Sequence, residues 1–272
     1  MSNYTVVLSI AGSDSGGGAG IQGDLKTMSA LGCFGTTAIT AVTVQNTVGV
    51  QQVFPIPVDV VTAQVQAVLE DLKPTAIKIG MVYNSELAMA LASLLQKYPE
   101  IPIVFDPVMV STSGDKLFRD NSISVLRKTL LPMSHLLTPN LDEASVLAEM
   151  KIGNVDEMKI AAQKILRYGG FAVLVKGGHL KGVKLYDIYL DQDGNQYTFQ
   201  SEVIETSNTH GTGCSLSSAI ASYLALGMSL LDSISKARIY LRNAIIEGKD
   251  VKTGSGHGPL NHFFCPEKLL IR

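Results

Sequence analysis

Residues 208–214, which read Asn-Thr-His-Gly-Thr-Gly-Cys, contain the side chains whose types and spacing point most directly to chemistry, and they lead into the apolar stretch 215–226. Gly211 and Gly213, on either side of Thr212, allow a tight turn whose N–H groups stay uncovered. The first turn of a helix has four N–H groups without intrahelical partners and the positive end of the helix dipole, so it binds anions such as phosphate. Cys214 would lie on that turn, where the same field lowers a thiol pKa. The segment predicts phosphoryl transfer; a tight turn with a small buried cysteine is the alternative.

A second glycine-rich segment, residues 11–20, reads Ala-Gly-Ser-Asp-Ser-Gly-Gly-Gly-Ala-Gly. It matches neither the dinucleotide fingerprint nor the Walker A pattern, so a nicotinamide cofactor is not expected. Its glycines favour a backbone that approaches a small substrate closely, and a flexible strand-to-helix connector is the alternative. Asp24 follows one turn into the next helix, at an expected surface position. Its carboxylate would hold an amino or hydroxyl group of a substrate, or complement the helix N-terminus.

Further polar side chains follow predicted strands. Asp106 follows strand 103–105 and would contact a metal or an incoming hydroxyl, or serve as a turn residue. Asn140 and Glu143 form a pattern close to a capping box, which is the alternative to their facing a hydrated magnesium ion. Lys176 ends strand 172–176 and would lie along nucleotide phosphates, or be a solvated loop lysine. Because ligands of open α/β sheets bind at the carboxyl ends of the strands, we expect these groups to meet at one edge.

The elements that would position these groups alternate between strand and helix along the chain. The predicted strands are 5–11, 36–44, 76–79, 103–105, 135–137, 172–176, 184–190 and 196–200, the last two joined by a hairpin-type turn. The predicted helices are 21–31, 58–72, 85–96, 141–150, 156–168, 213–226 and 231–247. This alternation predicts an α/β fold with a mostly parallel central sheet covered by helices on both faces. No linker or composition break interrupts it, so we expect a single domain over residues 1–272.

The composition limits the class of protein. A chain of 272 residues with 46% hydrophobic and 17% charged residues can fill a large core. The net charge of −2 gives no reason to expect a nucleic acid or an anionic membrane as partner. Three widely spaced cysteines and five histidines show neither a disulfide framework nor a zinc pattern, and no serine-hydrolase motif is present. Without a basic leader or a bilayer-length apolar run, we expect a cytoplasmic protein.

Six segments resemble, in order, the motifs of the hydroxymethylpyrimidine/phosphomethylpyrimidine kinases of thiamin biosynthesis. They are residues 12–26, 44–47, 78–81, 138–144, 176–179 and 208–214, and they span nearly the whole chain. The resemblance implies a ribokinase-like three-layer sandwich. It implies ATP-dependent phosphorylation of 4-amino-5-hydroxymethyl-2-methylpyrimidine and then of its monophosphate to the diphosphate. It also implies Mg²⁺ as a cofactor and a homodimer.

The resemblance also assigns roles to single residues. The substrate contacts would be Ala19, Asp24, Gln45, Met81, Val108 and Cys214. Gln45 would hydrogen-bond the aminopyrimidine, while Met81 and Val108 would pack against its ring. Gly211, Thr212 and Gly213 would form the anion hole, and Cys214 would accept the proton of the substrate hydroxyl. Lys176 and Asn140 would lie on the nucleotide side, and Asn140 with Glu143 matches the magnesium-organising pair of the family, with Asp106 as a second acidic contact.

Two alternative functions remain open from the sequence. Pyridoxal also carries a hydroxymethyl group on a six-membered nitrogen ring, so a pyridoxal or pyridoxine kinase of vitamin B6 salvage is the nearest alternative. A non-catalytic nucleotide-binding module on the same fold is the other. Residues 111–117, which are rich in small side chains, would form a lid that excludes water from ATP.

Overall fold

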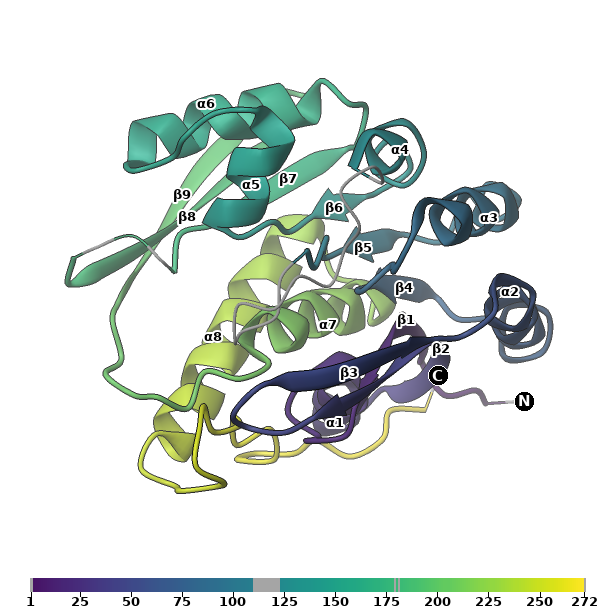
Figure 1. Cartoon of the computed structure of the whole chain (residues 1–272), viewed down its shortest axis with the longest axis horizontal. Helices are drawn as coiled ribbons and strands as arrows, with labels where there is room; N and C mark the ends of the chain where they lie inside the picture. The colour runs from purple at the N-terminus through teal and green to yellow at the C-terminus, as the bar shows by residue number, and fades with distance from the viewer. Residues whose placement is uncertain (1, 110–122, 179, 181, 272) are drawn as a thin grey trace.

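A nine-stranded sheet forms the centre of the computed structural model, which describes residues 2–109, 123–178, 180 and 182–271 (Figure 1). The strands are β1 (Val6–Asp14), β2 (Phe34–Gln45), β3 (Val50–Pro55), β4 (Ala76–Ile79), β5 (Ile103–Phe105), β6 (Leu136–Leu137), β7 (Ala172–Lys176), β8 (Lys184–Asp191) and β9 (Gln196–Glu202). The helices are α1 (Gly20–Ala30), α2 (Val58–Ala67), α3 (Ser85–Leu95), α4 (Ile123–Lys128), α5 (Leu141–Ala148), α6 (Val155–Leu166), α7 (Thr212–Ala225) and α8 (Leu230–Gly248), with a π-helical turn (Val68–Leu72) continuing α2.

The order of the strands places the carboxyl ends of most of them along one edge. The order is β3-β2-β1-β4-β5-β6-β7-β8-β9. Strands β2, β1, β4, β5, β6 and β7 pair in parallel, whereas β3 runs antiparallel to β2, and β8 and β9 form an antiparallel extension beyond β7. Parallel strands need crossover connections, and here helices supply most of them. The segments that follow β1, β4, β5, β6 and β7 therefore begin at the same edge of the sheet.

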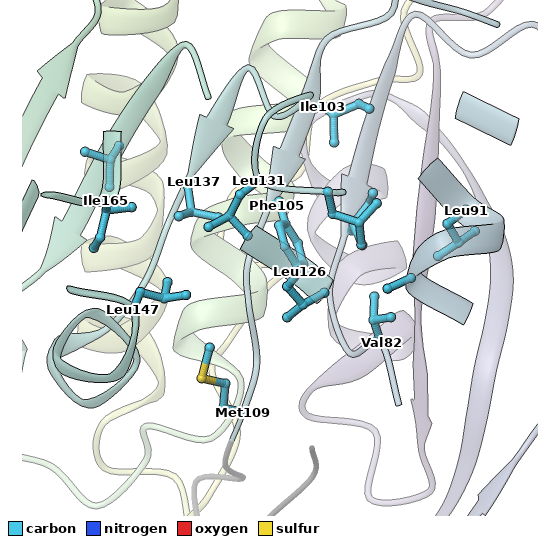
Figure 2. Packing of buried hydrophobic residues seen from close by; sticks show 14 of the residues in the cluster. Val82, Leu91, Ile103, Phe105, Met109, Leu126, Leu131, Leu137, Leu147 and Ile165 are labelled. Carbon is cyan, nitrogen blue, oxygen red and sulfur yellow. The ribbon is translucent and has the colours of Figure 1, made fainter. Parts of the chain in front are cut away.

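Successive residues of the central strands face two different helix layers. In β4, Ile77 and Ile79 belong to a buried cluster with α2 to α6, whereas Ala76 belongs to one with α1, α7 and α8. Figure 2 shows part of the first cluster, with Phe105 of β5 among side chains that include Leu126 of α4 and Leu131. Because side chains alternate along a strand, a sheet covered on both faces needs apolar residues at every position. The predicted three-layer α/β fold is confirmed.

Several elements differ from the prediction. The helix expected over 58–72 is α-helical only to Ala67, and Lys73, with φ 47°, closes its π-helical end by donating from its N–H to the Val68 carbonyl. Strand β1 runs on to Asp14 because Ser13 and Asp14 pair with β2 beyond a register shift. Strand β3 and helix α4 were not predicted. β3 reads Val-Gln-Gln-Val-Phe-Pro and forms the sheet edge with no fully buried side chain, so it lacks an apolar run. The lid expected over 111–117 lies outside the described residues.

Within the described part of the chain, no helix combines the length and the apolar character that a membrane span requires.

Candidate active site

A cavity of about 1010 Å³ lies where the strands end. Its wall includes the segment after β1, the end of β2, the residues after β4 and β5, the start of α5, the end of β7 and the turn before α7. The predicted site residues that line it are Ala19, Gln45, Met81, Asp106, Val108, Asn140, Glu143, Lys176, Gly211, Thr212, Gly213 and Cys214. Asp24 is the predicted site residue that does not line it. The cavity thus brings together groups that are up to 195 residues apart, from Ala19 to Cys214, as expected from the ends of parallel strands.

The glycine turn before α7 faces this cavity. Gly211 is the N-cap residue and has φ 85°, a conformation that glycine adopts without steric cost. A Cβ atom at Gly211 would lie 1.9 Å from the carbonyl oxygen of Gly18, so the position has no room for a side chain. Thr212 and Gly213 then open the 14-residue helix, and no side chain caps its first N–H groups. The turn has the properties of an anion site: helix N–H groups, the positive end of the dipole, and an open face.

Cys214 lies on this turn and keeps part of its surface open to the cavity. The pKa of its thiol is raised to about 11: burial is the main cause and Asp24 and Asp106 act in the same direction, while the Lys78 ammonium and a Gly20 backbone hydrogen bond oppose them. The expectation of a lowered thiol pKa is therefore wrong. The helix field is real, but the desolvation of a charged sulfur at this depth outweighs it.

Asp24 is fully buried rather than at the surface. Its two carboxylate oxygens accept from the Lys78 ammonium at 2.9 and 2.8 Å. Ser9 donates to Oδ2 at 2.5 Å and Ser218 donates to Oδ1 at 2.6 Å. Burial alone would lower the pKa of Lys78, but Asp24, together with the charges of Cys214 and Asp106, outweighs it and the pKa lies above the usual value. The surface position expected for Asp24 is corrected, because α1 turns this residue inward against β1, β4 and α7. Its substrate contact stays a prediction.

Lys78 lines the cavity and was not among the predicted site residues. The sequence contained a signal for it, because Lys78 is the one charged residue within the apolar strand 76–79. A charge is almost never fully buried unless it is paired. The partner, however, is 54 residues away along the chain.

Lys176, at the end of β7, forms a second ion pair, with Asp106 after β5. Its ammonium donates to Asp106 Oδ1 at 2.7 Å, and Thr138 donates to the same oxygen at 3.0 Å. Burial raises the pKa of Asp106, but the charges of Lys176 and Lys78 outweigh this and the pKa lies below its usual value. The Lys176 side chain is 14% exposed, so it is not a solvated loop lysine. The pair holds one cation at the cavity wall, where an anionic ligand would be attracted.

Asn140 and Glu143 form the capping box at the start of α5. Glu143 N–H donates to Asn140 Oδ1 at 2.9 Å, and Asn140 N–H donates to Glu143 Oε2 at 2.8 Å. Burial raises the pKa of Glu143 to about 7; Lys176 lowers this pKa and Asp106 raises it. The capping box, which was the alternative to a magnesium contact, is therefore present, and both residues also line the cavity. A cation is stabilised beside a buried carboxyl group that lies next to a second carboxylate.

The part of the cavity wall formed by Met81 and Val108 is less polar. Met81 and Val108 pack in one small apolar cluster with Ala41, beside the end of β2. The side chain of Gln45 also lies there, and its Oε1 accepts from the Thr43 hydroxyl at 3.1 Å. An apolar surface next to an amide suits a flat heterocycle with polar substituents. Met81, Val108 and Gln45 line the same cavity as the glycine turn and Cys214.

The three-layer fold and this cavity define a ribokinase-like small-molecule kinase. A family model described as phosphomethylpyrimidine kinase matches residues 14–261. The chain belongs to the phosphomethylpyrimidine kinase family.

Individual relatives agree with this assignment. A hydroxymethylpyrimidine/phosphomethylpyrimidine kinase of Rhizobium meliloti (strain 1021) is 48% identical over 95% of this chain and 97% of its own. A crystal structure of a phosphomethylpyrimidine kinase from Clostridium difficile 630 is 42% identical, with a TM-score of 0.78 over 88% of this chain and 99% of that one. A pyridoxal kinase from Staphylococcus aureus, in complex with AMP-PCP and pyridoxal, is 33% identical, with a TM-score of 0.86 over 96% of this chain and 94% of that one.

Proposed function

We propose that this protein transfers the γ-phosphoryl group of ATP to 4-amino-5-hydroxymethyl-2-methylpyrimidine, and then to the resulting monophosphate to give the diphosphate. The observation that carries the proposal is the shared cavity. The glycine turn of α7, the Lys176–Asp106 pair and the Met81–Val108 wall all line it. Membership of the family supports the pyrimidine as substrate, and the AMP-PCP complex of the related kinase supports a nucleoside triphosphate as phosphoryl donor.

Phosphoryl transfer needs positioning and electrostatic stabilisation more than covalent chemistry, and the chain supplies both. The N–H groups at residues 211–213 would hold phosphoryl oxygens as negative charge spreads over them. The Lys176 ammonium would contribute a compact positive charge on the nucleotide side. Gln45 would fix the orientation of the aminopyrimidine by hydrogen bonds, and Met81 and Val108 would hold the ring. Together these groups would bring the hydroxymethyl oxygen into line with the transferred phosphorus.

A divalent cation such as Mg²⁺ fits the acidic side of the cavity. The described residues hold no group of three or more histidine, cysteine or carboxylate side chains that would bind a metal alone. Mg²⁺ usually takes one or two carboxylates together with water and substrate phosphates. Asp106 and Glu143 offer such a pair; burial is the main cause that raises the pKa of Glu143 and the charge of Asp106 adds to it, so a cation beside them would favour the ionised carboxylate. When bound, the ion would neutralise charge on the phosphates.

Cys214 would accept the proton of the substrate hydroxyl. With the thiol pKa raised to about 11 by burial, only a small fraction is ionised at neutral pH. A minor thiolate is sufficient for a transfer in which bond formation to the nucleophile lags behind cleavage. The variant Cys214→Ala should lower kcat about a hundredfold, within the range of general-base effects, and should flatten the rise of kcat with pH. Near-full kcat with an unchanged pH profile would leave Cys214 with a binding role only.

A coupled ADP-release assay with Mg²⁺ and ATP tests the proposal. It would compare the hydroxymethylpyrimidine, its monophosphate and pyridoxal at equal concentrations. We expect turnover of both pyrimidines, with a lower kcat/KM for pyridoxal. Pyridoxal as the best substrate would establish the alternative, which the fold similarity to the pyridoxal kinase favours. No turnover of any of the three would leave a nucleotide-binding module, recognisable by stabilisation with ATP alone.

We also propose that residues 1–272 act as one kinase domain, because every strand described belongs to one sheet and both apolar clusters run along it. The homodimer that the resemblance implies stays a prediction, and sedimentation equilibrium would test it.

A further inference from the structure

His210, the residue before the glycine turn, connects three loops. Its Nε2 lies 2.8 Å from Asp14 Oδ2, and the two side chains are 8% and 3% exposed. Its backbone N–H donates to the carbonyl of Gly258 at 3.1 Å, which links the turn to the third glycine-rich loop, residues 254–258. None of the roles proposed above uses Asp14 or His210.

The Asp14 carboxylate determines the shape of the loop that follows β1. Gly16 N–H donates to its Oδ1 at 2.7 Å, while Gly18 and Ala19 N–H donate to its Oδ2 at 3.1 and 2.9 Å. Burial raises the pKa of Asp14, but the hydrogen bond from His210 and those from the backbone outweigh it, so the pKa lies below the usual value. An ionised carboxylate surrounded by N–H donors makes strong, short contacts. The loop that ends at Ala19 is thus wrapped around one side chain.

The two loops joined by this pair are in direct backbone contact. A Cβ atom at Gly18 would lie 2.3 Å from Cδ2 of the His210 ring. As noted for Gly211, a Cβ there would meet the Gly18 carbonyl. Neither glycine has room for a side chain, so the two loops pack closely at these positions. The position of Ala19 is therefore set relative to residues 211–213, and Asp14 and His210 are the side chains that close the contact.

We propose that Asp14 and His210 form a positioning pair that clamps the loop 14–20 against the glycine turn and thereby sets the distance between the substrate hydroxyl and the transferred phosphoryl group. This inference rests on the proposed function, in which Ala19 lies on the substrate side and residues 211–213 lie on the phosphate side. A displacement of about 1 Å between reacting groups costs up to a hundredfold in rate. The pair would act through the loops, and neither side chain needs to contact the reacting atoms.

Three variants separate positioning from simple stabilisation. His210→Gln places an amide nitrogen at the reach of Nε2 and keeps a donor to Asp14. His210→Asn is too short to reach it. His257→Asn is the matched control, because His257 is an exposed histidine of the neighbouring loop. Urea unfolding of each variant would report how much of the protein is folded under assay conditions.

We expect His210→Asn to lower kcat by about 30- to 100-fold, with KM for the pyrimidine changed by less than about threefold, because alignment matters most in the transition state. His210→Gln should keep kcat within about fivefold of the wild type, and His257→Asn should not change it. A kcat for His210→Asn within twofold of the wild type would overturn the proposal. So would an equal loss in both His210 variants, or a loss that follows only the fraction unfolded.

Hydrogen–deuterium exchange of the loop gives a readout that does not depend on catalysis. The amides of Gly16, Gly18 and Ala19 should exchange at least tenfold faster in His210→Asn than in the wild type, and near the wild-type rate in His210→Gln. Unchanged protection in His210→Asn would overturn the clamp. If the wild-type protein did not phosphorylate the pyrimidine, the proposed function would fail, while the exchange experiment would still decide whether the pair holds the loop.

Discussion

Two lysines that line the same cavity, Lys78 and Lys176, are each paired with an aspartate, and the two pairs differ in how completely they are buried and hydrogen-bonded. Lys78 and Asp24 are both 0% exposed, and each carboxylate oxygen accepts from the ammonium and from one serine, Ser9 or Ser218. Lys176 is 14% exposed, and among the described residues its ammonium donates to one oxygen of Asp106. Glu143 adds a second carboxyl group beside Lys176 and Asp106, which we call the open pair. Lys78 and Asp24, which we call the closed pair, are hydrogen-bonded by two serines instead.

The difference distinguishes an ion pair that stabilises the fold from one that can bind a ligand. A buried pair whose hydrogen-bonding capacity is filled cannot exchange its partner for a ligand without leaving a charge exposed to low dielectric. The open pair has an excess of carboxyl groups, so an incoming metal ion improves its balance of charge, and its partly exposed cation can contact an incoming phosphate. We therefore expect the closed pair to govern stability and the open pair to govern catalysis.

The largest effect should follow from breaking the closed pair. Lys78→Met leaves Asp24 buried without a countercharge and should lower the free energy of unfolding by about 3–5 kcal/mol. The double variant Asp24→Asn/Lys78→Met should recover a large part, because asparagine still hydrogen-bonds both serines. Lys159→Met, which removes an exposed pair with Asp156, is the control and should cost less than about 1 kcal/mol. Urea unfolding measures all three. A loss below about 1 kcal/mol for Lys78→Met would mean that the pair does not support the fold.

The open pair should respond in activity. Lys176→Met should lower kcat/KM for ATP about a hundredfold, equivalent to about 3 kcal/mol. Its stability should fall less than that of Lys78→Met, because Glu143, with its pKa raised by burial to about 7, can take up a proton when the lysine charge is lost. Steady-state kinetics and urea unfolding give the two readouts. Unchanged ATP kinetics with a large stability loss would show that both pairs are structural.

The smallest effect concerns Cys214, which the closed pair influences in both directions. With its thiol pKa raised to about 11 by burial, its alkylation by iodoacetamide should accelerate about tenfold per pH unit between about pH 8 and 10. Asp24→Asn/Lys78→Met should change the rate less than about tenfold, because Lys78 lowers this pKa and Asp24 raises it. Mass spectrometry resolves Cys214 from the exposed Cys265, which reports reagent activity. A rate that levels off by pH 8 would restore the lowered pKa expected from the helix field.

Strands buried on both faces were the best predicted part of the fold. The prediction matched the bounds of β4, β5 and β7, because each is a short run whose every position but the last of β7 is buried. Strand β3 was missed because an exposed edge strand needs no apolar pattern. The gathering of the site at one edge followed from parallel pairing alone, since consecutive strand ends must meet there.

The local environment of the site could not be predicted to the same degree. Nothing near Asp24 in the sequence indicates that α1 turns it inward, because Lys78 and Ser218 come from distant elements. The predicted direction of the Cys214 pKa shift was wrong for the same reason. The helix field is a local property, whereas desolvation depends on everything packed around the thiol. The clamp between Asp14 and His210 joins residues 196 positions apart. Neither residue type indicates its partner.

Ser218 is the member of the closed pair's hydrogen-bond network that comes from α7, and it bears on when, during folding, water is excluded from Lys78 and Asp24. Ser9, Asp24 and Lys78 belong to β1, α1 and β4, within the first 80 residues, whereas Ser218 belongs to α7. Because α7 supplies this part of the enclosure, we expect water to reach the ion pair until α7 docks. The same helix carries the glycine turn. We therefore expect water to leave the closed pair at the same step of folding that brings the glycine turn to the cavity. Activity regained on refolding would report that step.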